Sequence, residues 1–235
     1  LRDPRAQLVP VGVQRLTQPR LHALHGQWRI VRNLMCQRHR RRHQVVVRPD
    51  PRHAAQPSRI FAAPAAAGQE PRARHPAPTT RAVEATESVW ARTFAALVDP
   101  LPRLFRAILP TMIDRRAGKI LVIGGASALR GTKRLSTYSA ARGAQLAYVQ
   151  AVGVEVAPHN VQVNALAQNF VENPTYFPPE VQANPRFQEL LKREVQLGRL
   201  AGARADAEFA AYRCSELGNC FVGQVFPVCG GWVQR

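Results

Sequence analysis

Tyr138 and Arg142 are the residues whose types and spacing most directly suggest catalysis. They lie four positions apart in STYSAARG (136–143), so on a helix they share one face. A free tyrosine, with a pKa of about 10, is a poor base at neutral pH. A fixed positive charge beside the phenol stabilises the phenolate, and arginine supplies that charge because it stays protonated. The pair therefore predicts a general base; an ordinary pair on a helix surface is the alternative.

The elements that must position this pair are predicted from the apolar pattern after residue 88. Helical spacing covers 88–116, bent near Pro100 and Pro102, and the run KILVIGG (119–125) has the length and composition of a strand buried on both faces. This order predicts an α/β fold, the second half of a Rossmann-like doubly wound parallel sheet. The further elements expected are a helix at 137–156, a strand at 161–166, a loop at 167–182, helices near 184–196 and 204–217, and a strand near 223–231.

Residues 1–83 have a different character from residues 84–235. They contain 16 arginines, no lysine and three acids, and so carry +13 of the net charge of +18. Their apolar runs are short (8–13, 30–35, 45–47), and arginine clusters and prolines interrupt them. We therefore predict a basic, irregular segment before a folded part at 84–235. Its composition is also what a GC-rich coding sequence yields when read in a shifted frame.

The cysteines and the hydropathy pattern exclude two classes of protein. The chain has no run of about 18 apolar residues, so no membrane contact is expected. Its four cysteines show no CxxC or paired zinc spacing, so no metal is expected. Buried thiols in a reducing compartment are the simplest interpretation, which predicts a cytoplasmic protein.

Residues 84–235 resemble the short-chain dehydrogenase/reductase superfamily. The resemblance rests on KILVIGG, the Tyr138 helix, NVQVNALAQN (160–169), LGRL (197–200) and GQVFPVCGGW (223–232). That superfamily is characterised by Tyr-x-x-x-Lys with an upstream serine, and by Pro-Gly after the VNA strand. Here the lysine position is Arg142 and the Pro-Gly position is Gln168-Asn169. Both departures are similar to the halohydrin dehalogenase branch, which uses Ser, Tyr and Arg and holds a halide in place of the nicotinamide.

The resemblance implies a lyase that converts vicinal haloalcohols to epoxides with release of halide and without a cofactor. Tyr138 would be the general base, Arg142 would stabilise its phenolate, and a hydroxyl group would hold the substrate oxygen. The resemblance also implies a homo-oligomer formed by helices 88–113 and 137–156. Aromatic edges, amides and backbone N–H groups of the 167–182 loop suit a weakly hydrated halide, although a lid that only closes the core is the alternative. The residues expected to bind halide and substrate are Gln168, Asn169, Phe170, Val171, Tyr176 and Phe177.

Two features depart from that branch. The serine expected thirteen residues before Tyr138 is replaced by Gly125, and the nearest hydroxyl is that of Ser127. Losing the hydroxyl should cost about 10²–10³ in rate, which predicts impaired or lost activity. In addition, no glycine-rich phosphate turn occurs in residues 1–83, and without preceding strands the run 119–125 is expected to have an exposed edge.

Two other functions stay open from the sequence. One is an NAD- or NADP-dependent oxidoreductase of the same superfamily, whose cofactor turn would be hidden by an altered N-terminal segment. The other is a basic nucleic-acid-binding protein that uses QRHRRRHQ (37–44). Because no aromatic residues interleave with these arginines for base stacking, we do not expect nucleic acid to be the partner.

Overall fold

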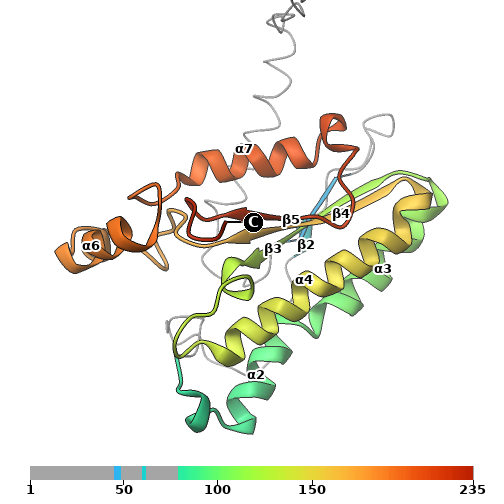
Figure 1. The fold of residues 1–235 in the computed structure, drawn as a ribbon. Helices are drawn as coiled ribbons and strands as arrows, with labels where there is room; N and C mark the ends of the chain where they lie inside the picture. The colour runs from blue at the N-terminus through green and yellow to red at the C-terminus, as the bar shows by residue number, and fades with distance from the viewer. Residues whose placement is uncertain (1–44, 49–59, 62–78, 235) are drawn as a thin grey trace, which may run out of the picture.

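The computed structural model describes residues 45–48, 60–61 and 79–234, and in this part of the chain it contains a five-stranded sheet (Figure 1). The strand order is β2-β1-β3-β4-β5, with β3, β4 and β5 parallel to one another. The strands are β1 (Val45–Arg48), β2 (Ile60–Phe61), β3 (Gly118–Gly125), β4 (Val161–Gln168) and β5 (Val225–Val228).

The helices follow the predicted order. Two of them, α3 and α4, lie together on one face of the sheet and α7 lies on the other (Figure 1). This layering confirms the predicted Rossmann-like α/β class. The α-helices are α2 (Glu87–Leu97), α3 (Pro100–Asp114), α4 (Ser136–Val156), α5 (Pro179–Gln182), α6 (Pro185–Glu194) and α7 (Ala203–Arg213). Short 3-10 helices are η2 (Ala82–Glu84), η3 (Ala126–Ala128), η4 (Ala157–His159) and η5 (Glu216–Gly218).

The edge of β3 is covered by β1, so the expectation of an exposed edge is wrong. The two strands pair antiparallel, with Val46 opposite Leu121. The run VVV is β-branched and suits a strand, and pairing in either direction satisfies the free N–H and C=O groups of an edge. A non-local contact of this kind leaves no periodic signal in the sequence.

The predicted division at residues 83 and 84 stays a prediction. Strands β1 and β2 precede it and nevertheless belong to the sheet. The runs at 8–13 and 30–35 and the basic stretch 37–44 lie outside the described residues. None of the helices in the described ranges has the length and apolar character needed to cross a membrane.

Between the sheet and helices α3 and α4 lies the main apolar core. Phe105 of α3, Val149 of α4 and Val163 of β4 are each at most 1% exposed and belong to one cluster. Burial of this kind stabilises by about 25 cal/mol per Å² of apolar surface, so the core holds α4 firmly against β3 and β4. The N-terminal turns of α4 are therefore held beside the carboxyl ends of these two strands.

The predicted bend near Pro100 is a complete break between α2 and α3. Pro100 occupies the first turn of α3, where its missing N–H is not needed. At the break Leu101 donates its N–H to Val98 O, three residues back, at 3.0 Å. The carbonyl of Leu97 is therefore not taken by the backbone N–H that would bind it in a continuous helix.

Candidate active site

Tyr138 and Arg142 form a contact in the first turns of α4. The Nε–H of Arg142 donates to the phenol oxygen of Tyr138 at 3.0 Å, and the guanidinium carbon lies 5.1 Å from the centre of the tyrosine ring. Both side chains are half-buried. The guanidinium therefore contacts the phenol directly, as the spacing predicts.

Arg142 is held from its other side by the protein interior. Its Nη1 donates to Gln145 Oε1 at 2.9 Å and to the Ile123 carbonyl of β3 at 3.3 Å. Gln145 is 2% exposed, and its Nε2 donates to Leu97 O at 2.6 Å. The sequence reasoning missed Gln145. The signal that was available is an amide at a position of α4 where its neighbours Leu146 and Val149 are buried and apolar.

Gly125 lies directly against Arg142 at the end of β3. A Cβ atom built on Gly125 would lie 3.1 Å from both Cδ and Nε of Arg142, closer than ordinary van der Waals contact. The position at which the resemblance expects a serine therefore gives space to the arginine side chain. Sequence reasoning treated Gly125 only as a lost hydroxyl, because it could not show this contact.

Gly125 also joins the two predicted groups of residues. In the β3–β4 ladder it lies opposite Gln168, the first residue of the predicted halide and substrate loop. Because the carboxyl ends of parallel strands meet at one edge, the Tyr138–Arg142 pair and this loop flank the same glycine. The tertiary structure thus places both predicted groups at one end of the sheet.

Ser127 lies in η3, immediately after β3, and is 9% exposed. Its Oγ is buried and makes no hydrogen bond within the described residues, to Tyr138 or to any other group. A buried hydroxyl without a partner is costly, because its bonds to water are lost and not replaced. Ser127 is therefore near the strand end, as predicted, but the structure does not join it to the tyrosine.

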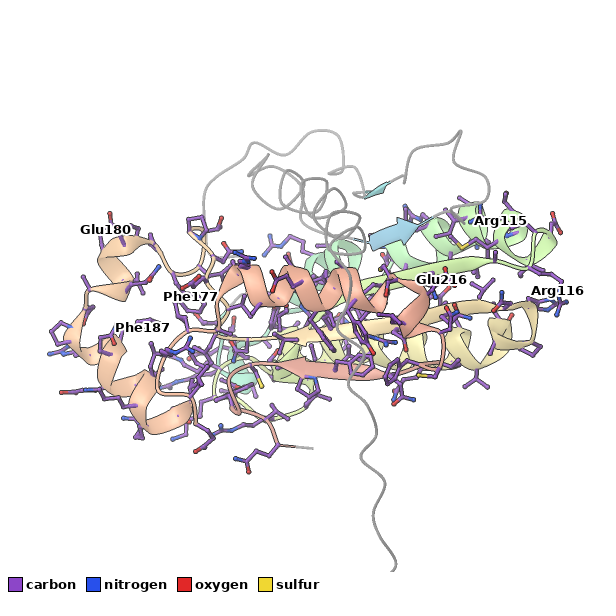
Figure 2. All side chains as sticks on the ribbon, turned by 90° about the horizontal axis from the view of Figure 1, so that it is seen from above. Arg115, Arg116, Phe177, Glu180, Phe187 and Glu216 are labelled. Atoms are coloured by element: carbon purple, nitrogen blue, oxygen red, sulfur yellow. The ribbon has the colours of Figure 1, made fainter. Side chains whose placement is uncertain are left out.

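The loop after β4 forms an aromatic cluster. Phe170 lies 6.0 Å from Phe177, and Phe177 lies 6.4 Å from Tyr176, all measured between ring centres. Two residues that the sequence reasoning did not include extend the cluster: Trp232 is 5.9 Å from Phe170, and Phe187 is 5.4 Å from Phe177. Phe177 and Phe187 lie together at the end of the molecule formed by α6 (Figure 2).

The backbone of this loop turns sharply at Phe170. The residue has a φ of 51°, in the left-handed region that a bulky side chain rarely adopts. The preceding Asn169 supports it, because its Oδ1 accepts from the Phe170 N–H at 3.0 Å, while its own N–H donates to Val228 O at 3.1 Å. Val171 forms a β-bridge with Ala201. Both ends of the turn are therefore tied to neighbouring segments.

Gln168 contacts a buried acid. Its Nε2 donates to Asp206 Oδ2 at 2.5 Å, from β4 to the first turn of α7. Asp206 is 2% exposed, and its Oδ1 has no hydrogen-bond partner among the described residues. Burial raises the pKa of this carboxyl, and the hydrogen bond from Gln168 opposes that effect only in part. Sequence reasoning also missed Asp206.

The described residues do not include the parallel strand and glycine turn that hold a dinucleotide in a doubly wound sheet. In a doubly wound sheet the parallel strand beside β3 and the turn that follows it belong to the nucleotide-binding half. Here that place is taken by β1, which runs antiparallel. In addition, Arg142 Nη1 is turned inward to Gln145 and Ile123 O. Among the described residues, no group of three or more His, Cys, Asp or Glu side chains is placed to hold a metal ion.

Comparison with known proteins identifies a family and several relatives. The family described as enoyl-(acyl carrier protein) reductase matches residues 66–233. Dehydrogenase/reductase SDR family member 4 from Sus scrofa is 27% identical over 153 residues, which cover 65% of this chain and 54% of that protein. The uncharacterised oxidoreductase YmfI from Bacillus subtilis is 33% identical over 129 residues, which cover 55% of this chain and 52% of that protein. The chain spans about half the length of the curated relatives it matches.

Solved structures of two kinds are similar. A dehalogenation enzyme has a TM-score of 0.65 and 29% identity, covering 68% of this chain and 66% of that one. A halohydrin dehalogenase bound to ethyl (2S)-oxiran-2-ylacetate has a TM-score of 0.64 and 28% identity, covering 69% and 67%. The L-sorbose reductase of Gluconobacter frateurii shares the fold, with a TM-score of 0.61 and 21% identity. The match covers 67% of this chain and 63% of that one.

Proposed function

The chain belongs to the short-chain dehydrogenase/reductase superfamily, in the family described as enoyl-(acyl carrier protein) reductase, and we propose that it is a halohydrin dehalogenase-like lyase. It would convert vicinal haloalcohols to epoxides with release of halide, using neither nucleotide nor metal. The observation that carries the proposal is the hydrogen bond from Arg142 Nε to the phenol oxygen of Tyr138. A permanently charged donor on the phenol oxygen suits a tyrosine that acts as a base.

The reaction needs one proton transfer and one displacement. The phenolate of Tyr138 removes the hydroxyl proton of the substrate. The resulting alkoxide attacks the neighbouring carbon, forms the second C–O bond of the epoxide and expels the halide with the electrons of the carbon–halogen bond. Arg142 remains protonated throughout and stabilises the phenolate before the transfer. The proton on Tyr138 then passes to solvent, so the cycle closes.

The halide would be received by the loop after β4. The Val171 N–H, the Gln168 amide and the rings of Phe170, Tyr176 and Phe177 are of the kinds that suit a weakly hydrated anion. The N–H groups of Asn169 and Phe170 already donate to Val228 O and to Asn169 Oδ1. Ser127 stays the proposed donor to the substrate oxygen, because its Oγ is buried without a partner beside the strand end. The small-molecule partners would therefore be a haloalcohol or epoxide and a halide ion.

The two dehalogenase structures support this proposal, since each covers about two thirds of the chain at 28–29% identity. The second candidate is an NAD- or NADP-dependent oxidoreductase. It is favoured by the curated relatives, whose names describe a dehydrogenase/reductase and an oxidoreductase. Against it stand the antiparallel β1 beside β3 and the inward-facing Arg142.

The discriminating experiment compares two activities of the full chain. We expect chloride release from 1,3-dichloro-2-propanol that does not depend on added nucleotide and is lost in Tyr138→Phe. We expect no consumption of NADPH with carbonyl substrates. Consumption of NADPH without halide release would reject the lyase and select the oxidoreductase.

Two further expectations belong to the same proposal. A homo-oligomer through the helices at 88–113 and 137–156 is tested by the mass of the particle in solution, and a monomer would reject it. The cytoplasmic location is tested by cell fractionation. The competing function, nucleic-acid binding by residues 1–83, predicts instead an affinity that falls steeply with salt and is abolished when these residues are deleted.

A further inference from the structure

Gln145 forms the innermost link of a hydrogen-bonded chain that ends at Tyr138. It lies three residues after Arg142 on α4, on the same side of the helix, and is 2% exposed. Building on the lyase proposed above, we infer that Gln145 is a positioning residue for the base. It holds Arg142 against Tyr138 and ties both side chains to the corner between α2 and α3.

Both ends of the Gln145 amide are used, and this determines its orientation. Oε1 accepts from Arg142 Nη1 at 2.9 Å, and Nε2 donates to Leu97 O at 2.6 Å. If the amide were flipped, its NH2 group would face a guanidinium and its oxygen would face a carbonyl, so both hydrogen bonds would be lost. A buried amide with two unpaired ends would be costly, because its hydrogen bonds to water are lost and not replaced. Gln145 is therefore a fixed acceptor pointing at Arg142.

The carbonyl of Leu97 is available to Gln145 because of the helix break. Leu101 gives its N–H to Val98 O, so the Leu97 carbonyl is left for a side chain from α4. The hydrogen bond from Gln145 satisfies it, as the last carbonyls of a helix require. The proline-containing corner thus supplies the anchor on which Gln145 and Arg142 depend.

Arg142 needs such an anchor because its surroundings do not otherwise confine it. An arginine side chain loses much rotamer entropy when it is held in one geometry. Towards Gly125 the arginine faces a residue that has no side chain. Its hydrogen bond to Gln145 is 2.9 Å long, against 3.0 Å to Tyr138 and 3.3 Å to Ile123 O. Without Gln145 the guanidinium would have room to leave the phenol.

The first test measures the position of Arg142 directly and needs no substrate. In the 15N-labelled full chain, the Arg142 Nε–H signal is assigned by its loss in Arg142→Lys. We expect this signal to be visible in the wild type and lost through exchange with water in Gln145→Met, which removes both hydrogen bonds. It should be retained in the control Gln150→Met, whose side chain is exposed on the same helix. A signal that persists in Gln145→Met overturns the inference.

A second variant covers the case in which Gln145→Met does not fold. Gln145→Asn keeps the amide but is one methylene too short to reach both Arg142 and Leu97 O. We expect the same loss of the Nε–H signal, and an unchanged signal again overturns the inference.

The activity of the same variants tests the consequence for the base. We expect kcat for halide release to fall by about 10–100-fold in Gln145→Met while KM changes little, because a displaced cation weakens the base rather than substrate binding. Unchanged kcat together with a lost signal would overturn the role in catalysis. A wild-type chain that releases no halide would reject the proposed function, while the signal of Arg142 would still decide whether Gln145 positions it.

Discussion

The two faces of the sheet differ in how completely their buried charged side chains are paired. On the α4 face, the buried Gln145 has a partner at each end of its amide, and Arg142 is bound by Tyr138, Gln145 and a backbone carbonyl. On the α7 face, Asp206 and Arg213 are each 2% exposed and each keeps atoms without a hydrogen-bond partner among the described residues. Among the described residues, the buried charged side chains with unpaired atoms thus lie on the α7 face, while the unpaired buried atoms near the candidate site are the hydroxyls of Ser127 and Ser139.

Arg213 is the clearest case on the α7 face. Its guanidinium lies 3.6 Å from the centre of the Phe221 ring and 4.6 Å from that of Phe226, while Nε and Nη1 find no partner in the described residues. Loss of water lowers the pKa of this guanidinium. Stacking on aromatic rings offsets only part of the cost of burying a cation. We therefore predict that substitutions on the α4 face change the activity, and that the unpaired charges on the α7 face lower the stability of the folded chain.

The largest effect is expected from Tyr138→Phe on the α4 face. Removing the phenol removes the proposed base, so kcat for halide release should fall by about 10²–10⁴-fold. Tyr148→Phe is the matched control, because Tyr148 lies on the same helix and packs edge-on against Phe105 at 5.3 Å. Steady-state halide release by both variants checks this; equal losses would remove Tyr138 from the mechanism.

The next effect concerns Gly125. Gly125→Ala adds only the Cβ atom that would lie 3.1 Å from Arg142 Cδ and Nε, so Arg142 must move. We expect kcat to fall by about tenfold, because a small displacement of the cation weakens the base. Gly125→Ser adds the same Cβ together with the missing hydroxyl, so it should be less impaired than Gly125→Ala. A fully active Gly125→Ala variant would show that Arg142 tolerates the added Cβ atom without leaving Tyr138.

On the α7 face, the expected effect is a gain in stability. Arg213→Met replaces a buried cation by an apolar side chain of similar length and should stabilise the fold by about 1–2 kcal/mol. The midpoint of thermal unfolding should rise by about 4 °C. Arg204→Met, at an exposed position of the same helix, should leave the midpoint nearly unchanged. A lower midpoint in Arg213→Met would mean that aromatic stacking outweighs the cost of burial.

The smallest effect is a change in how stability depends on pH. Burial raises the pKa of Asp206 in the folded chain above its ordinary value of 3.8. Between these two pKa values the folded state binds more protons than the unfolded one. The carboxyl therefore leaves the free energy of unfolding unchanged below pH 3.8, and it lowers that free energy as the pH rises through the raised pKa. Asp206→Asn should therefore raise the unfolding midpoint at neutral pH and not in acid. Equal shifts at both pH values would contradict the prediction.

Much of the fold was predictable because it depends on local patterns. The strand 119–125, the helix 137–156 and the break near Pro100 follow from apolar periodicity and from proline geometry, and the structure confirms all three. The contact between Tyr138 and Arg142 was predictable for the same reason, since residues four apart on a helix are neighbours.

The rest of the site depends on contacts between distant segments. Gly125 meets Arg142 across seventeen positions, and Gln145 reaches Leu97 across 48. No spacing rule links such pairs, because they meet only when helices pack on the sheet. The pairing of β1 with β3 was missed for this reason, and so were the roles of Gln145, Asp206 and Trp232.

Residue types and periodicity were thus sufficient for the α/β class, for the order of the elements and for a tyrosine with a cation beside it. Only packing decided that Gly125 leaves space for Arg142 and that the Leu97 carbonyl at the α2–α3 corner accepts from Gln145. Packing also decided that Asp206 and Arg213 are buried on the α7 face with unpaired atoms. The reason is physical: periodicity records which face of an element is buried, but the partner of a buried polar group is whichever atom the folded chain brings within hydrogen-bond distance.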